Sequence, residues 1–290
     1  MFSAIDALKI FLPLDPSLVD IGAAKGDFTS SFLEAFPGAQ AVLFEPTGKS
    51  VVALQERFRE NTRIQILSHA IGNAQGTATL YSYEQSENNS LLNSLVQDAE
   101  VLQNSVKVET LDDCLAQSGM LSKVDMIKID TQGTDLKVIQ GARKTIERFH
   151  PLILAEAIFV PLYDGQDSYY GILDFMRQLE YHLAGIFEMH CRQDGLLAFA
   201  DLLFLPEQIY LQFCSSQTFG HFVSVDAKYL KEQNRTLEQV CEERLNLIEQ
   251  LQMTADERLK LINELSKIAG ERLTVIQTMD AEVKKLKGTE

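Results

Sequence analysis

The chain of 290 residues contains no tryptophan and only four cysteines, which are scattered singly and form no C-x-x-C pair. This spacing argues against a zinc cluster and against a disulfide framework, so we expect reduced thiols in a cytoplasmic protein. No run of about 18 apolar residues occurs, and a membrane-spanning helix is therefore not expected. The N-terminal segment lacks the basic start and the small-residue cleavage site of a secretory signal.

Positive charge is also scarce. The chain carries 26 Lys and Arg against 41 Asp and Glu, a net charge of −15. Residues 1–227 account for −14 of this, and residues 228–290 for −1. An acidic body of this kind repels a phosphate backbone, so neither nucleic acid nor an anionic membrane is an expected partner.

What the sequence does contain is a regular alternation of short apolar, β-branched runs with amphipathic stretches over about the first 200 residues. This alternation is typical of βαβ units, and it predicts an α/β fold with a parallel sheet covered on both faces. The expected strands are 18–22, 39–45, 64–70, 124–130, 152–157, 183–187 and 197–205, with extra strands at 77–83 and 106–110. The expected helices are 28–36, 48–60, 134–148 and 168–180, and the polar segment 84–98 is expected to be a loop.

The C-terminal part differs in character. Three copies of a 14-residue repeat begin at Glu243, Glu257 and Glu271, each with the pattern Glu-Arg-Leu-x-x-Ile. Fourteen residues are two heptads, so the same helical face returns in every copy. We therefore expect two parts, a globular domain over 1–227 and a helical coiled coil over 228–290 that joins chains into a homo-oligomer. A single amphipathic helix folded back on the domain is the alternative.

A glycine turn follows the first expected strand, in the segment VDIGAAKG. The small residues that would let a ligand lie against the backbone are Gly22, Ala23, Ala24 and Gly26. The spacing G-x-x-x-G differs from the G-x-G-x-x-G of pyrophosphate sites. Asp20, at the end of the strand, could accept a hydrogen bond from a ligand amine or from the loop itself. An acid in this place favours an ammonium-bearing ligand, such as the amino-acid end of S-adenosylmethionine.

Glu45 ends the second expected strand, 25 positions after Asp20. A carboxylate at this position can accept both hydroxyls of an adenosine ribose. The alternative is a residue that only caps the next helix. Taken together, the order and spacing of the two motifs predict a nucleoside-binding sheet.

A third motif, MIKIDTQG, spans residues 126–133. Strand alternation places Lys128 and Asp130 on one side, with Asp130 at the edge of the sheet where it could hold a substrate hydroxyl, act as a base or ligate a metal. Its alternative role is to cap the following helix. Glu156 ends another apolar strand and needs a partner there, for which Lys128 is a candidate. If a divalent metal binds, Asp130 and Glu156 are the expected ligands.

These motifs together resemble the FkbM family of S-adenosylmethionine-dependent methyltransferases. The matching stretches are VDIGAAKGDFT (19–29), FEP (44–46), AIGNAQGTATLY (70–81), VETLDD (108–113), KIDTQGTDLKVIQGA (128–142) and PLYDGQ (161–166), in the family's order. The resemblance implies a class I, Rossmann-like methyltransferase sheet, mostly parallel with an antiparallel last strand. It also implies methyl transfer to a hydroxyl of a sugar or other secondary metabolite. Related chains more often carry Asn at position 24 and Glu at position 132.

The family likeness also implies roles for individual residues. Asp20, Gly22 and Gly26 would line the methionine end of S-adenosylmethionine, Glu45 the ribose, and the turn at Ala70 and Ile71 the adenine. Asp130 would lie beside the sulfonium. The expected catalytic residues are Asp130, Glu156 and Lys128. Apart from the resemblance, His190 is a candidate base, with a surface or hydrogen-bonded histidine as the alternative. Asp201 is a candidate polar group on the acceptor side, with turn formation as its alternative.

Two other readings stay open. A nicotinamide-dependent oxidoreductase could use the same sheet, although the G-x-G-x-x-G motif is absent. A catalytically degenerate body that serves as a coiled-coil scaffold is the second, and the retention of Asp20, Gly22, Glu45 and Asp130 argues against it.

Overall fold

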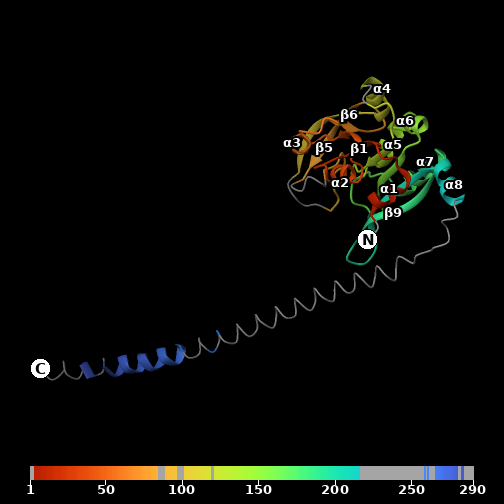
Figure 1. Cartoon of the computed structure of the whole chain (residues 1–290). Coiled ribbons are helices and arrows are strands. Elements are labelled where there is room, and N and C mark those ends of the chain that lie inside the picture. The colour runs from red at the N-terminus through yellow and green to blue at the C-terminus, as the bar shows by residue number, and fades with distance from the viewer. Residues whose placement is uncertain are drawn as a thin grey trace. The chain divides into compact units, whose positions relative to one another are not determined.

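The computed structural model describes residues 3–83, 89–96, 101–118 and 121–215, and in the C-terminal part residues 258, 260, 265–279 and 282–283. The strands are β1 (Ser17–Ile21), β2 (Gln40–Phe44), β3 (Ile64–Leu67), β4 (Ala70–Ile71), β5 (Gly76–Ser82), β6 (Leu102–Glu109), β7 (Met126–Ile129), β8 (Leu152–Ile158), β9 (Tyr181–Cys191) and β10 (Leu197–Pro206). The helices are α1 (Ala4–Phe11), α2 (Asp27–Ala35), α3 (Gly48–Arg57), α4 (Leu111–Ser118), α5 (Asp135–Gly141), α6 (Arg143–Phe149), α7 (Tyr169–Gln178) and α8 (Glu207–Ser215) (Figure 1).

A seven-stranded sheet with the order β3-β2-β1-β7-β8-β10-β9 organises the domain. The pairs β3–β2, β2–β1, β1–β7 and β7–β8 are parallel, whereas β10 runs antiparallel to both of its neighbours. The mostly parallel sheet and the antiparallel last strand expected from the sequence are therefore confirmed.

The central strands are buried on both faces because helices cover the sheet from two sides. Successive residues of β1 point in opposite directions, and the core divides accordingly. Val19 and Ile21 pack in a cluster with residues of α4, α5, α6 and α7, such as Val138. Leu18 packs in a second cluster with residues of α1, α2 and α3, such as Phe32. Each strand end is held firmly by this double packing, so side chains at the edge of the sheet have fixed positions.

Two expected elements are each divided in the structure. The strand expected at 64–70 is wrong as one element, because β3 joins the main sheet and β4 joins a separate sheet with the order β4-β6-β5. The helix expected at 134–148 is two helices that meet at Ala142. At this junction a Cβ on Gly141 would lie 2.0 Å from the carbonyl oxygen of Gly72, so only glycine allows the helix to approach that turn. Hydrophobic periodicity does not report such a break, since both helices keep one apolar face.

In the C-terminal part, residues 265–279 form a helix, and every side chain of this helix is exposed. Residues 1–220 and 221–290 form two separate units. Most of the expected coiled coil, and the boundary expected at 227/228, lie outside the described residues, so both stay predictions. Among the described residues, no helix is long and apolar enough to cross a membrane.

Candidate active site

The glycine turn after β1 brings two parts of the candidate site together. Gly22 has a φ of +79°, and a Cβ at this position would lie 1.8 Å from the carbonyl oxygen of Asp130. Its amide donates to the carbonyl oxygen of Phe44 at 2.9 Å. Gly22 therefore lets the carboxyl ends of β1, β2 and β7 meet at one edge of the sheet, where open α/β sheets bind ligands.

A pocket with a volume of about 120 Å³ opens at this edge. The predicted cofactor-binding residues that line it are Gly22, Ala24, Glu45, Ala70, Ile71 and Asp130, whereas Asp20, Ala23 and Gly26 are not among its lining residues. Its walls also include residues that sequence reasoning did not assign to the cofactor, namely Thr47, His69, Thr131, Gln132 and Thr134. Asn89 and Ser90, from the segment expected to be a loop, line it as well. Apolar walls with a few polar groups are typical of a cofactor pocket.

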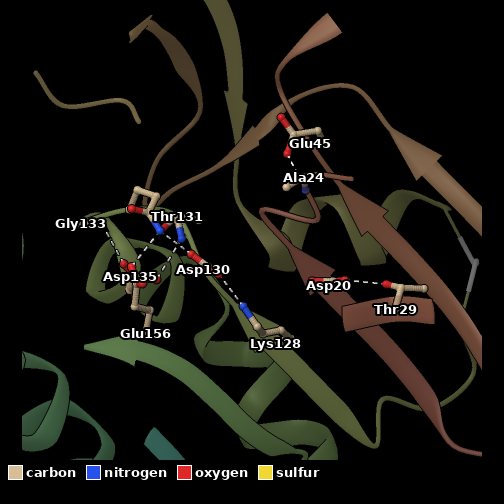
Figure 2. A network of polar contacts seen from close by, with 11 residues as sticks. Asp20, Ala24, Thr29, Glu45, Lys128, Asp130, Thr131, Gly133, Asp135 and Glu156 are labelled. Atoms are coloured by element: carbon tan, nitrogen blue, oxygen red, sulfur yellow. Dashed lines mark hydrogen bonds and ion pairs between the residues drawn. The ribbon is translucent and has the colours of Figure 1, made fainter. Parts of the chain in front are cut away.

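Asp20 faces the protein rather than the pocket. Its carboxylate accepts a hydrogen bond from Thr29 Oγ1 at 2.5 Å, and only 1% of the residue is exposed (Figure 2). Burial raises the pKa of Asp20 above its ordinary value, although the charge of Lys128 acts in the opposite direction. The hydrogen-bond partner that the structure shows for Asp20 is thus Thr29 of α2, rather than the glycine loop.

Glu45 holds two loops in place and also lines the pocket. One carboxylate oxygen accepts from the amide of Ala24 at 2.9 Å, and the other accepts from the amide of Thr47 at 2.8 Å. Burial raises the pKa of Glu45, while these hydrogen bonds act to lower it. The carboxylate therefore ties the glycine turn to the segment between β2 and α3.

Lys128 and Asp130 form an ion pair with 2.8 Å between Nζ and Oδ2, in which the lysine is buried and the aspartate is partly exposed (Figure 2). Burial by itself would raise the pKa of Asp130, but Lys128 and Gln132 outweigh it, and this pKa lies below its ordinary value. The ion pair expected between Lys128 and Glu156 is therefore not the one that forms. Glu156 instead accepts from Gln132 Nε2 at 3.1 Å.

Gln132 connects the two carboxylates. The same Nε2 atom donates to Asp130 Oδ1 at 2.9 Å, and Tyr163 donates its hydroxyl hydrogen to Gln132 Oε1 at 2.7 Å. The residue has a φ of +54°, a backbone conformation that is uncommon for a side chain of this size. Burial raises the pKa of Glu156 well above its ordinary value, and the nearby charge of Asp130 raises it further. The two carboxyl groups on either side of this amide therefore have pKa values shifted in opposite directions, downward for Asp130 and upward for Glu156.

Asp135 was not foreseen from the sequence as part of this network. It accepts hydrogen bonds from the amides of Thr131 and Gly133 at 3.1 and 3.2 Å (Figure 2). Asp135 therefore orders the turn before α5. The sequence offered this capping role to Asp130 as an alternative, and the structure gives it to Asp135. Burial raises the pKa of Asp135 to about 7. An acid just after a glycine turn was the available signal, since such residues often bind free amides at a helix start.

A groove lies on the other side of Asp130. It has a volume of about 740 Å³, and its lining residues include all four predicted catalytic residues, which are Lys128, Asp130, Glu156 and His190. The ring of His190 stacks on Phe199 with 4.4 Å between centroids. Asp201 also lines the groove, and burial raises its pKa to about 6. Asp130 is the residue that lines both the pocket and the groove.

The strand order and the pocket at the carboxyl ends of the strands define a class I methyltransferase-like α/β fold. The family model described as "Methyltransferase FkbM domain" matches residues 20–183, and this chain belongs to that family. The C-terminal repeat lies outside the matched residues.

Two curated proteins are similar to the chain. The 2-O-methyltransferase NoeI from Sinorhizobium fredii is 27% identical over 179 residues, which are 57% of this chain and 73% of NoeI. Methyltransferase 1 from Beauveria bassiana is 24% identical over 149 residues, which are 44% of this chain and 59% of that protein.

Two solved structures are similar to the chain at low identity. The methyltransferase FkbM from Methylobacillus flagellatus KT has a TM-score of 0.46 and 16% identity, with 70% of this chain and 47% of that chain covered. This chain therefore spans less than half the length of that protein. The fibrillarin from Aeropyrum pernix, in complex with natively bound S-adenosyl-L-methionine, has a TM-score of 0.40 and 13% identity, with 69% and 73% covered.

Proposed function

We propose that this methyltransferase moves the methyl group of S-adenosylmethionine to a hydroxyl of a carbohydrate or related metabolite. The observation that supports this function best is the position of Asp130 between the pocket and the groove. A donor in the pocket and an acceptor in the groove would meet at this carboxylate. Methyl transfer is an in-line displacement, so such a meeting point is what the reaction needs most.

In the pocket, Glu45 would accept the ribose hydroxyls with lone pairs that its two amide bonds leave free. The adenine would lie against the apolar side chains of Ile71 and Leu80, beside Ala70. The methionine end would lie near Gly22 and Ala24. The proposed contact of Asp20 with this end is indirect, because its carboxylate is bonded to Thr29.

In the groove, an oxygen lone pair of the acceptor would attack the methyl carbon while the carbon–sulfur bond breaks. The bonding electrons then pass to sulfur, which yields S-adenosylhomocysteine. An alcohol is a weak nucleophile, and its proton must pass to a base. Asp130 would supply negative charge beside the sulfonium, and Asp201, whose pKa of about 6 lies near neutral pH, would take the proton. Lys128 would hold Asp130, and the stacked ring of His190 would support the acceptor.

The relative NoeI, whose name specifies 2-O-methyl transfer, supports an oxygen acceptor. Membership of a methyltransferase family disfavours the oxidoreductase reading. The scaffold hypothesis predicts a chain that no longer binds the cofactor.

We further propose that residues 228–290 join chains into a homo-oligomer. A divalent metal at Asp130 and Glu156 is a separate proposal. Such an ion would have to displace the side-chain amide of Gln132, which bridges these two carboxyl groups.

Isothermal titration of the full chain with S-adenosylhomocysteine tests the cofactor, and we expect saturable binding. Transfer of a labelled methyl group to a panel of neutral sugars, with an amine-only compound as control, then tests the acceptor class. Absence of binding at millimolar co-product would contradict the methyltransferase function. Binding without transfer to any hydroxyl, but with transfer to the amine, would contradict only the oxygen acceptor.

A further inference from the structure

Three side chains with different donor atoms converge beside the cofactor pocket. His69 lies between β3 and β4, Glu109 ends β6, and Cys114 lies in the first turns of α4. Their ligand atoms all lie within 4.8 Å of one another. Cys114 Sγ is 3.4 Å from His69 Nε2 and 3.3 Å from Glu109 Oε2. Within the part of the chain that the structure describes, this is the one group of three potential ligands this close together.

The spacing of these atoms fits a tetrahedral metal ion. Zinc bonds of about 2.3 Å to sulfur and about 2.0 Å to nitrogen or oxygen place neighbouring ligand atoms about 3.5 Å apart. The two measured separations are within about 0.2 Å of that value. A nitrogen, an oxygen and a sulfur donor together form a set that zinc favours, whereas calcium and magnesium favour oxygen alone. We propose that His69, Glu109 and Cys114 bind one Zn²⁺ ion.

The metal-free arrangement of the three residues is compatible with loading. The thiol of Cys114 donates to Glu109, and Lys107 pairs with the same carboxylate. The side chain of Lys107 is 65% exposed, so it can turn into solvent when the ion arrives. As the zinc–sulfur bond forms, the thiol proton leaves to solvent. Three protein ligands leave the fourth position of the ion to water.

A bound ion would hold in place one wall of the cofactor pocket. His69 lines the pocket next to Ala70 and Ile71, and its ring meets that of Phe44 edge-on with 5.5 Å between centroids. A bound ion would tie the β3–β4 connection directly to α4 and would add to the existing pairing of β4 with β6. The site is separate from Asp130 and Glu156, and it does not depend on the proposed reaction. Its residues are 40 and 5 positions apart in the sequence, so no short metal-binding motif announces it.

The experiment uses the full chain, stripped with a chelator, reloaded with zinc or cobalt and then desalted. We expect about one equivalent of retained zinc by mass spectrometry of the metal, and a thiolate-to-cobalt charge-transfer band in the cobalt form. Cys114→Ser should abolish this band and weaken zinc binding by at least about tenfold, and His69→Asn should weaken it similarly. Cys191→Ser, which changes an exposed cysteine, is the matched control and should bind zinc like the wild type.

Three results would overturn the proposal. One is a folded wild-type chain that retains no zinc, and another is a Cys114→Ser variant that retains as much zinc as the wild type. The third is loss of zinc on Glu156→Gln with retention on His69→Asn, which would place the ion in the groove. Should Cys114→Ser fail to fold by circular dichroism, His69→Asn and Glu109→Gln carry the same test.

Discussion

The side-chain amide of Gln132 holds Asp130, with 2.9 Å between Nε2 and Oδ1. The same nitrogen reaches Glu156 at 3.1 Å, and Tyr163 fixes the orientation of the amide through its oxygen. One neutral side chain thereby separates an ionised carboxylate from a carboxyl group whose pKa is strongly raised. The resemblance to the FkbM family implies a Glu at this position, where this chain has an amide donor.

Gln132→Glu should disturb this arrangement more than its small change in shape suggests. The variant loses the donor to both carboxyl groups and adds a charge between them, which raises the pKa of Asp130. Loss of a hydrogen bond to a charged group costs about 1.5–3 kcal/mol. We expect turnover to fall by about tenfold or more, and its acidic limb to move to higher pH. Steady-state rates between pH 5 and 9 measure both effects.

Gln65→Glu is the matched control, because Gln65 is an exposed residue of β3. It makes the same chemical change away from the carboxylates and should leave the pH profile unaltered. Equal profiles for Gln132→Glu and the wild type would show that the amide does not set the ionisation of Asp130.

Glu45→Gln should weaken cofactor binding. A glutamine oxygen can accept from only one of the amides of Ala24 and Thr47, so one loop loses its tie. We expect the affinity for S-adenosylhomocysteine to fall by about tenfold, and the free energy of unfolding by about 1–3 kcal/mol. Titration calorimetry and urea denaturation measure these quantities. Glu56→Gln, on the exposed side of α3, should change neither.

The motifs that could be predicted from the sequence are those in which neighbours along the chain decide the geometry. Gly22 and Glu45 each follow an apolar strand, and parallel strands bring their carboxyl ends to one edge of the sheet. Asp20 shows the limit of this argument. Alternation along β1 sends its side chain away from the pocket that Ile21 lines, toward Thr29 of α2 and Lys128. The position of an acid at the end of a strand thus does not specify which side of the sheet it serves.

Asp201 should make the stability of the protein depend on pH. Its folded-state pKa of about 6 lies above the value of 3.8 expected for the unfolded chain, because burial disfavours the charge. The neutral form therefore contributes stability fully below about pH 4, and this contribution is lost as the pH rises through about 6. Asp201→Asn stays neutral throughout. Between pH 5 and pH 8 the free energy of unfolding should fall by about 1 kcal/mol less in this variant than in the wild type.

Urea denaturation at the two pH values checks this expectation. Asp15→Asn is the control, because it makes the same chemical change at an exposed position. A pH dependence in Asp201→Asn as steep as that of the wild type would mean that Asp201 is already ionised in the folded protein at pH 5.

His190→Ala should affect the acceptor and not the cofactor. The variant removes a stacked ring from the groove, and such pairs contribute about 1 kcal/mol. We expect KM for the acceptor to rise about fivefold while the affinity for S-adenosylhomocysteine stays the same. His182→Ala is the matched control, because His182 also lies on β9 and stacks on Tyr210, outside the groove. A fall in kcat of about a hundredfold would instead identify His190 as the base.

The contacts that could not be predicted are those between distant segments. Tyr163 reaches Gln132 from 31 positions away, and Cys114 reaches His69 from 45. No period or spacing rule encodes such pairs, because they depend on how β8 and the two sheets pack. The partner of Glu156 was misassigned for the same reason. Lys128 has the right charge, but Asp130 lies just past the end of β7, two residues further along the chain, and accepts a hydrogen bond from the ammonium group.

Ile276→Lys should separate the chains if the C-terminal repeat forms a coiled coil. Ile276 is 61% exposed within the helix at 265–279, so a lysine there costs an isolated helix little. In a coiled coil Ile276 would belong to the apolar seam, the helix face on which Ile248, Ile262 and Ile276 recur in the three repeats. A buried charge there would be strongly unfavourable. We expect light scattering to report a lower mass for this variant and for a chain that ends at residue 227. Gln277→Lys, one position away and off the seam, should keep the wild-type mass. A full chain whose mass equals that of one monomer, 32.6 kDa, would exclude the oligomer.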